Sequence, residues 1–309
     1  MAYWRNLVWT FGALCAALAA FSAAAQQPKA NIGYIGAADF TPLFVAKDKG
    51  MFDKAGLDAT LTRIQIAPNV GPAIMAGNLQ IGMGTVPNLL HAAEGGLPLI
   101  AIAGASRMKK GNPIAGLVGR SGLAINSPAD LKGKKIASPG LNTMLTELLE
   151  KWLYDNKVPR DQVTLVEIVF PQQHDTLKSG VVDAAITIEP FRSRILSDGT
   201  GFKIADYVGE VNPDIVAVLW MAKSDWANAN PQAVRAFRQA YAEAIEWCAK
   251  NPDESKQIMQ KYLGFPSNVL PDYGVEVKLS DLEFFEGIER QLGKLRQPVD
   301  VKKLLWTGK

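Results

Sequence analysis

The chain has 309 residues and a nearly balanced charge, with 33 Lys and Arg against 30 Asp and Glu. This balance provides no electrostatic footprint for nucleic acid or anionic lipid, so we expect no nucleic-acid partner. Two cysteines and two histidines leave few residues for a disulfide framework, a metal site or a histidine-centred catalytic triad.

The N-terminal segment 1–25 predicts a cleaved signal peptide. Arg5 precedes an apolar run from Leu7 to Phe21, and small residues continue to Ala25. These are the regions of a secretory signal, whereas a membrane anchor needs about 20 strongly apolar residues. No later stretch has the length and apolarity to span a bilayer. We therefore expect cleavage after about Ala25 and a soluble protein in the periplasm.

A first block of alternating strands and helices follows. Strands are expected at 30–36, 57–62, 79–84, 99–103 and 114–118, and helices from Pro42, around 72–76 and at 88–94. The segment 99–103 is apolar on both faces, which is typical of a buried strand in a parallel sheet. We interpret 114–118 as the last strand of a first lobe, running into a crossover to a second lobe.

A second block repeats the pattern. Strands are expected at 135–138, 163–170 and 181–188, and helices at 144–154 and 175–179. The chain then returns to the first lobe through 211–221 and a long helix from Asn230-Pro231, in which Cys248 is expected to be a core thiol. Alternating strands and helices predict an α/β fold of two domains. The expected organisation is signal peptide 1–25, lobe one 26–120, lobe two 121–212 and a return to lobe one over 213–309.

Five ordered motifs carry a resemblance to a known family. They are Asp39–Phe52 with the following Ala55-Gly56-Leu57, Ala76–Gly82, Ser127–Lys135, Ser179–Ala185 and Glu189-Pro190-Phe191. The ordered set resembles the periplasmic binding proteins for nitrate, taurine, alkanesulfonates and thiamine precursors. The resemblance implies a two-lobed type II periplasmic binding protein, each lobe a mostly parallel sheet flanked by helices, joined by two crossovers. It also implies a monomer that binds a small-molecule ligand and delivers it to an ABC permease of the inner membrane with its ATPase.

Loops at the carboxyl ends of the strands are the expected ligand site, because ligands of open α/β sheets bind there. Four such loops, 36–40, 84–86, 138–143 and 189–191, would meet between the lobes, and in the resembled family these positions line the pocket. The candidate ligand-binding residues are Asp39, Phe40, Gly84, Thr85, Ser138, Leu141, Asn142, Thr143, Glu189, Phe191 and Trp220.

The loop 138–143 leads into a helix, whose free N–H groups favour an anion such as a carboxylate or sulfonate. Asn142 and Thr143 are equally suited to ordinary helix capping. An apolar wall is expected from aromatic side chains, with Phe40 the strongest candidate because it lies in a loop, although each aromatic residue is equally suited to the core.

Two acidic residues complicate a purely anionic ligand. Asp39 and Glu189 are each able to accept an amine or a ring N–H, which suits a zwitterion or a heterocycle. The alternatives are that Asp39 caps the following helix and that Glu189 pairs with Arg192 or Arg107. Arg107 is suited to grip an anion with its guanidinium, but we favour a solvated loop charge.

Motifs for catalysis are absent from the sequence. It contains no P-loop, no dinucleotide fingerprint, no H-E-x-x-H and no G-x-S-x-G, so we expect neither cofactor, nor metal, nor enzymatic activity. His91 is expected to be a surface or structural residue, whereas His174 falls in a loop that could face the cleft. A thiamine-pyrimidine synthase resembles the opening motif, but its cysteine-rich iron-binding signature is missing.

The expected function is capture of a small organic anion or zwitterion, of the sulfonate, carboxylate or aromatic acid type, by hinge closure. Binding of a thiamine-pyrimidine precursor or another heterocycle is the alternative ligand class. A receptor that presents its ligand to a membrane sensor is the alternative role.

Overall fold

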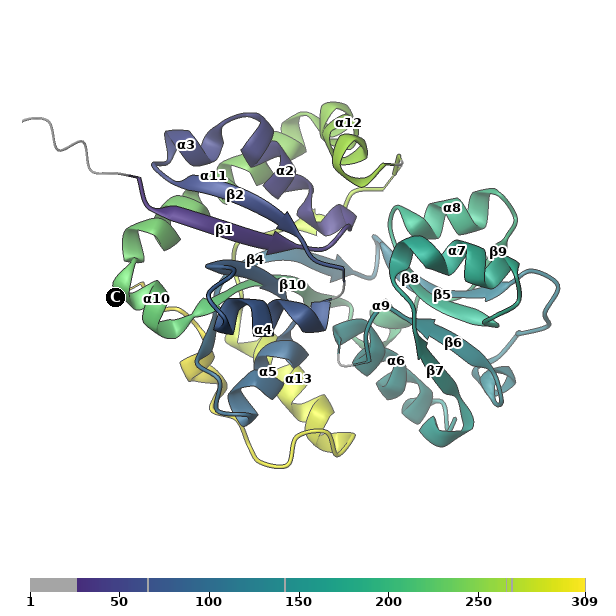
Figure 1. Cartoon of the computed structure of the whole chain (residues 1–309). Coiled ribbons are helices and arrows are strands. Elements are labelled where there is room, and N and C mark those ends of the chain that lie inside the picture. Colours follow the sequence, from purple (N-terminus) through teal and green to yellow (C-terminus); the bar gives the residue numbers. More distant parts are fainter. Residues whose placement is uncertain (1–26, 66, 142, 265, 268, 309) are drawn as a thin grey trace, which may run out of the picture.

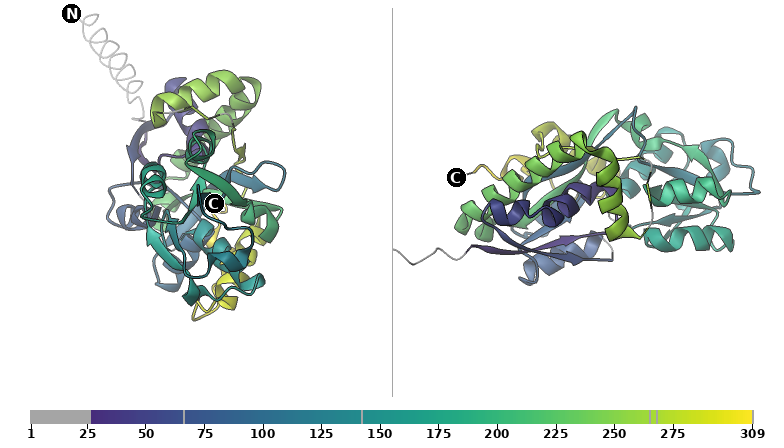
Figure 2. Two further views of the ribbon diagram at one scale, coloured as in Figure 1. Left: turned by 90° about the vertical axis from the view of Figure 1, so that its right-hand side faces the viewer. Right: turned by 90° about the horizontal axis from the view of Figure 1, so that it is seen from above.

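Two β-sheets, each covered by helices on both faces, form two lobes that lie side by side in the computed structural model (Figure 1). Seen from above, the lobes follow one another along the long axis of the molecule (Figure 2). The structure describes residues 27–308 apart from 66, 142, 265 and 268. The predicted signal peptide and the candidate Asn142 therefore lie outside the described residues.

Lobe one is built on a sheet with the strand order β11-β4-β10-β3-β1-β2. Its strands are β1 (Lys29–Tyr34), β2 (Asp58–Arg63), β3 (Ile81–Gly84), β4 (Leu99–Lys109), β10 (Asp214–Lys223) and β11 (Asp272–Tyr273). Its helices are α2 (Thr41–Asp48), α3 (Met51–Lys54), α4 (Val70–Met75), α5 (Val86–Glu94), α10 (Ser224–Ala229), α11 (Pro231–Lys250), α12 (Pro252–Leu263) and α13 (Leu279–Gln291). Helices α2, α3, α11 and α12 cover one face of this sheet, and α4, α5 and α13 cover the other (Figure 1).

Lobe two has a sheet with the order β7-β6-β8-β5-β9. Its strands are β5 (Ala115–Arg120), β6 (Lys135–Ser138), β7 (Thr164–Glu167), β8 (Ala184–Ile188) and β9 (Gly201–Ala205). Its helices are α6 (Met144–Asp155), α7 (Phe170–Lys178), α8 (Phe191–Ser197) and α9 (Tyr207–Val211). Helices α6 and α9 lie on one face and α7 and α8 on the other (Figure 1). Short 3-10 turns complete the chain, at Ala38–Phe40, Ala67–Asn69, Pro128–Leu131, Arg160–Gln162 and Val301–Leu304.

Local sequence signals explain where several helices begin and end. Helix α2 ends before Gly50, whose φ of 66° is easily adopted only without a side chain, and α3 starts directly after it. Helix α5 follows Thr85, whose backbone N–H and hydroxyl both donate to the side-chain oxygen of Asn88. The predicted long helix from Pro231 is confirmed as α11, and Cys248 on it is buried, as expected for a core thiol.

Both sheets are mixed, where mostly parallel sheets were predicted. The expectation of a parallel neighbour for the strand at 99–103 is wrong, because β4 pairs antiparallel with β10 and β11. A continuous apolar run indicates that a strand is buried on both faces, but it does not indicate the direction of the neighbouring strands. An antiparallel strand that is covered by helices on both sides is buried in the same way.

The strand expected at 114–118 belongs to the other lobe. It corresponds to β5, which pairs antiparallel with β8 and β9 of lobe two. The first crossover therefore precedes β5, and the second joins α9 to β10. Sheet membership thus favours a lobe boundary shortly before residue 115 over the predicted one at 120. Residue 170, expected at the end of a strand, is instead the first residue of α7.

The core of lobe one contains an aromatic cluster beneath the interlobe face. Trp220 on β10 is fully buried and packs edge-on against Phe40, Phe237 and Tyr241, with ring centroids 5.4–5.6 Å apart. Such contacts add about 0.5–1.5 kcal/mol each to the free energy gained from burying the rings. The cluster holds Phe40 rigidly at the surface that faces lobe two.

Candidate functional site

A pocket lies between the two lobes, and its cavity has a volume of about 50 Å³. Lobe one contributes residues at or after the carboxyl ends of β1, β2 and β3, together with residues of β4 and β10. Lobe two contributes residues that follow β6 and β7 and the last residue of β8. Strand ends of both sheets therefore meet at one cavity, as the rule for open α/β sheets requires.

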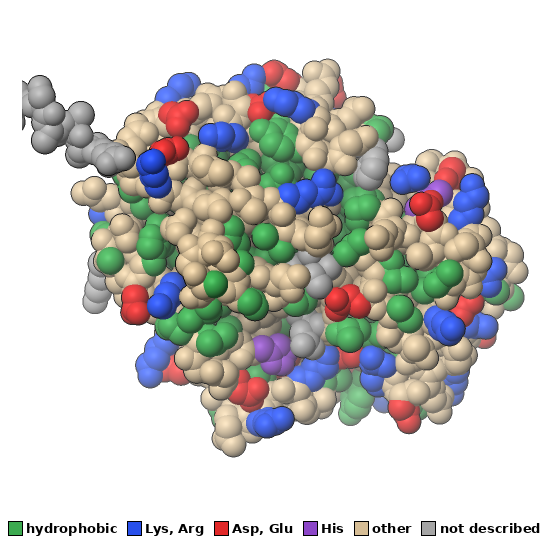
Figure 3. Space-filling model, viewed as in Figure 1, with side chains coloured by type: hydrophobic (Ala, Val, Ile, Leu, Met, Phe, Trp, Pro, Cys, Tyr) green, Lys and Arg blue, Asp and Glu red, His purple; other side chains and the backbone are tan. Residues whose placement is uncertain are grey.

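Apolar side chains make up most of the pocket lining, including the rings of Phe40 and Phe170 and three methionines, Met83, Met108 and Met144. On the visible face of the molecule, green apolar side chains lie on both lobes beside the line where they meet, together with red and blue charged patches (Figure 3). A flexible thioether adapts to irregular shapes, so this lining suits a ligand with an apolar body.

Four polar side chains line the same pocket: Asp39, Gln65, Thr85 and Thr143. No Lys, Arg or His is among the described lining residues. Thr143 donates its hydroxyl to the carbonyl of Gly140 at 2.9 Å and stands before the first turn of α6. Thr85 has the same place before α5, so two helix N-termini face the pocket.

Asp39 is the ionisable group of this lining. Its side chain is 2% exposed, and its carboxylate accepts a hydrogen bond from the hydroxyl of Ser106 on β4. Burial raises the pKa of Asp39 above its usual value, and the hydrogen bond from Ser106 opposes this shift. Ser106 and the Asp39 backbone N–H are thus described donors to the carboxylate, and the predicted capping of α2 by Asp39 is wrong, because Phe40 is the N-cap residue of that helix.

Three predicted residues, Ser138, Gly84 and Leu141, lie near the pocket without lining it. The Ser138 hydroxyl donates to the Gly140 carbonyl at 3.0 Å, so it shapes the loop before α6. Gly84 is packed against Met221, and a Cβ at this position would lie 2.3 Å from the Met221 terminal methyl group. The Leu141 side chain is 43% exposed. These three residues therefore support or flank the site.

The predicted aromatic wall is only partly at the pocket. Phe40 lines it, whereas Trp220 lies behind Phe40 in the core. Phe191 stacks on Phe170 with ring centroids 5.8 Å apart, and Phe170 provides the lining ring in its place.

Glu189 is buried beside the pocket, and its carboxylate accepts the backbone N–H of Ser193 at 3.3 Å. Burial raises its pKa. The expected ion pair with Arg192 or Arg107 is not formed, because Arg192 pairs with Asp206 at 2.6 Å. Glu189 nevertheless joins the lobes through its backbone, since its carbonyl accepts the Ala38 N–H at 3.3 Å.

Arg107 is not a solvated charge, contrary to the expectation, and it does not reach the pocket. Its guanidinium donates two bonds of 3.0 Å to Asp281 and one of 2.7 Å to Asp214. Burial and these carboxylates act in opposite directions on its pKa, and the net effect is to raise it. Arg107 therefore ties α13 to the sheet of lobe one.

His174 is not among the residues that line the pocket, and its ring nitrogens lie 2.7 Å from Asp175 and 2.5 Å from Asp198. His91 on α5 belongs to a different contact between the lobes, considered below.

The loops after β2 and β7 contribute lining residues that the sequence analysis did not propose, among them Gln65 and Val169. Both loops follow the carboxyl end of a strand, so the rule that ligands bind there would also have predicted these two loops. The methionines carry no comparable signal, because methionine fills irregular gaps in protein cores as well as at binding surfaces.

Known proteins resemble this chain over most of its length. The family model described as "NMT1/THI5 like" matches residues 37–255. The nitrate/nitrite binding protein NrtA of Nostoc sp. is 27% identical, over 89% of this chain and 68% of that protein. The taurine-binding periplasmic protein of Escherichia coli is 28% identical, over 84% of this chain and 80% of that protein.

Solved structures share the fold at lower sequence identity. The alkanesulfonate-binding protein SsuA from Xanthomonas axonopodis pv. citri, bound to MOPS, superposes with a TM-score of 0.79 at 19% identity, over 92% of this chain and 99% of that one. The desulfurization enzyme DSZB also shares the fold, with a TM-score of 0.63 at 17% identity, over 90% of this chain and 96% of that one. The fold is thus that of two-lobed, type II periplasmic binding proteins, and it also occurs in an enzyme. The chain belongs to the NMT1/THI5-like family.

Proposed function

We propose that this protein is the extracytoplasmic substrate-binding component of an ABC importer that captures a small organic anion or zwitterion between its lobes. The observation that carries the proposal is the interlobe pocket, which combines an apolar lining with the N-terminal ends of helices. Relatives named for nitrate and taurine binding support the transport role, as does one named as a nitrate import ATP-binding protein. The signal-like N-terminus supports export to the periplasm.

Helix N-termini supply the positive potential for an acidic group. Thr85, Thr143 and Val169 line the pocket and precede α5, α6 and α7. The first N–H groups of a helix lack partners within it, and the helix dipole favours negative charge at this end. A carboxylate or sulfonate fits this environment without a cationic side chain.

The apolar lining argues against a bare inorganic anion. Nitrate or bicarbonate would exchange its hydration shell for methionine and phenylalanine side chains, and burying an ion without compensating polar contacts is costly. An organic acid gains free energy from burial of its apolar part, at about 25 cal/mol per Å². We therefore favour a sulfonate or carboxylate with an apolar body over nitrate.

Asp39 favours a ligand that also carries an amine or N–H group. Its carboxylate is buried at the pocket wall and has Ser106 as a described hydrogen-bond donor. A cationic ligand group would compensate the buried charge, which makes a zwitterion a better match than a simple acid.

The lobe contacts describe a closed arrangement. Beside the pocket, the Ala38 N–H of lobe one donates to the Glu189 carbonyl of lobe two, and a Cβ on Gly140 would lie 3.2 Å from the Pro68 ring of lobe one. A ligand that contacts both lobes stabilises this state over an open one. Relatives that are named as binding proteins support capture without catalysis.

A ligand screen tests the proposal. Thermal unfolding would be followed with taurine, MOPS, alkanesulfonates, aromatic carboxylates, pyrimidines, nitrate and bicarbonate, and hits would be titrated by calorimetry. We expect a zwitterionic or organic acid to bind with micromolar or tighter affinity and nitrate to bind much more weakly. Binding of nitrate alone would contradict the ligand class, and conversion of a hit into product would contradict the transport role.

A further inference from the structure

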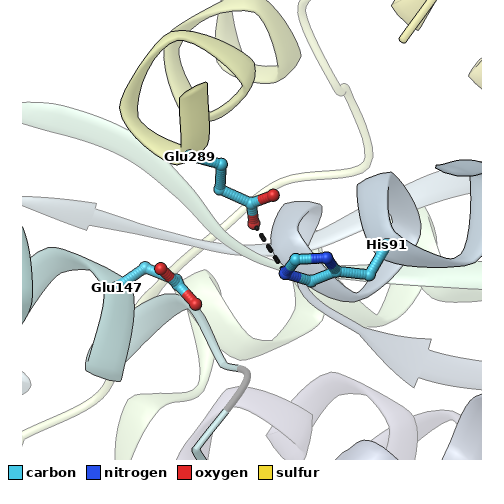
Figure 4. Close-up of side chains that lie close together, drawn as sticks. All are labelled: His91, Glu147 and Glu289. Atoms are coloured by element: carbon cyan, nitrogen blue, oxygen red, sulfur yellow. Dashed lines mark ion pairs between the residues drawn. The ribbon is translucent and has the colours of Figure 1, made fainter. Parts of the chain in front are cut away.

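A second contact between the lobes contains a buried cluster of one histidine and two glutamates. His91 on α5 and Glu289 on α13 belong to lobe one, and Glu147 on α6 belongs to lobe two (Figure 4). One ligand-type atom from each residue lies within 4.8 Å of the other two. None of the three residues lines the pocket described above.

Several polar atoms of this cluster lack hydrogen-bond partners among the described residues. They are His91 Nε2, Glu147 Oε2 and both carboxylate oxygens of Glu289. The side chains of Glu147 and Glu289 are fully buried. Buried polar atoms nearly always have a partner, so unpartnered atoms on three residues that converge on one place point to a missing ligand.

The charges around the cluster are incompletely balanced. Lys294 contacts Glu147 at 2.6 Å and Glu150 at 2.5 Å, and Arg160 also pairs with Glu150 at 2.6 Å. Among the described residues, the Glu289 carboxylate forms its one ion pair with the His91 ring, at 3.4 Å. Lys294 acts on this carboxylate through its charge without a salt-bridge contact.

We propose that His91, Glu147 and Glu289 bind a divalent transition-metal ion of the Zn²⁺ type. Neighbouring ligand atoms lie about 3.4 Å apart in tetrahedral zinc sites with bonds of about 2.0–2.2 Å, which matches the separation of His91 Nε2 and Glu289 Oε1. An imidazole ligand favours Zn²⁺ over Mg²⁺ or Ca²⁺, which take oxygen ligands.

The proposed metal site lies between the two lobes, so binding of the ion affects lobe closure. Two ligands come from lobe one and one from lobe two, so the ion completes its protein ligands only when the lobes are closed. Metal binding therefore favours the closed state independently of the organic ligand.

Zinc titration of the metal-stripped protein tests this site. We expect 1:1 binding of Zn²⁺ by calorimetry, no comparable binding of Mg²⁺, and a smaller radius of gyration by X-ray scattering once Zn²⁺ is bound. Glu289→Gln and His91→Ala should each weaken Zn²⁺ binding at least about tenfold. Circular dichroism and thermal unfolding without metal establish that each variant is folded.

His174 provides a matched control, because it is the other histidine of the chain and also lies beside two carboxylates. His174→Ala should leave the 1:1 affinity unchanged. The assignment is overturned if wild-type protein does not bind Zn²⁺, or if binding is lost in His174→Ala and kept in His91→Ala and Glu289→Gln. None of these results depends on the organic ligand, so the transport proposal stands or fails separately.

Discussion

The lobes meet in two chemically different places. In the pocket the facing side chains are mostly apolar, and Asp39 is the charged group among the described lining residues. At α6, Lys294 of lobe one bridges Glu147 and Glu150 of lobe two. Closure over the pocket is stabilised by burial of apolar surface against a ligand. Closure at α6 removes charged groups from water, and it is stabilised only when each charge is paired. Closure over the pocket therefore depends on which ligand is bound, whereas closure at α6 depends on how the lobes align their charged side chains.

The largest effect is expected from truncating the pocket wall. Phe40 is fully buried and packs on Trp220, so Phe40→Ala should lower the free energy of unfolding by about 3–5 kcal/mol and weaken ligand binding. Urea unfolding and calorimetry measure the two losses. Phe40→Leu is the control and should retain much of both. Unchanged stability in Phe40→Ala would show that the wall is not continuous with the core.

The charged contact should be the next most sensitive. Lys294→Met leaves the buried Glu147 without its ammonium partner, while Glu150 keeps Arg160, and this should disfavour closure by about 2–3 kcal/mol, or about a hundredfold in ligand affinity. This figure is below the usual loss for a fully buried pair because Lys294 is 22% exposed. The radius of gyration should increase.

A surface lysine controls for the loss of one positive charge. Lys303→Met removes a side chain that is 81% exposed and pairs only with Asp300 among the described residues, and it should change neither affinity nor size. Equal behaviour of the two lysine variants would contradict a role for Lys294 in closure.

A smaller effect is expected where the lobes touch beside the pocket. A Cβ at Gly140 would lie 2.9 Å from the Thr143 methyl group and 3.2 Å from Pro68. Gly140→Ala should therefore weaken ligand binding by about 1 kcal/mol, or roughly fivefold, measured by calorimetry. Gly287→Ala is matched to it, because a Cβ there meets nothing within 4 Å, and its affinity should equal that of the wild type.

The smallest effect concerns Asp39 and depends on pH. Its pKa is raised by burial, so the native state binds more protons than the unfolded state, and the carboxyl favours folding less as pH rises through its native pKa. Asp39→Asn should therefore gain stability relative to the wild type as the pH rises above about 4, the usual pKa of an aspartate in the unfolded chain, while its affinity for an amine-bearing ligand falls. Thermal unfolding across this range measures the gain. A stability difference between Asp39→Asn and the wild type that does not change with pH would contradict a buried carboxylate at Asp39. The same pH trend in the exposed Asp53→Asn would also contradict it.

The sequence was sufficient for most strands and helices, because the apolar periodicity, the glycine at position 50 and the proline at 231 act locally. Strand direction and lobe membership were harder, since β4 and β5 depend on partners far along the chain. Four of the predicted site residues, Asp39, Phe40, Thr85 and Thr143, line the pocket. Trp220 and Phe191 do not, because an aromatic ring beside a site and one behind it have the same sequence signature.

The cluster at His91 was beyond prediction for a similar reason. Its members come from three helices of two lobes. Glutamate on a helix is usually exposed, so the sequence alone gives no reason to expect Glu147 and Glu289 to be buried. Only the packing of α5, α6 and α13 places them inside the protein.

A crystal structure with the tightest organic ligand from the screen tests the central claim most directly. We predict its acidic group at the N-termini of α5 and α6, its apolar body between Phe40 and Phe170, and its amine or N–H group, where present, at Asp39. A ligand bound outside the interlobe pocket, or held there while the lobes stand apart, would contradict the account.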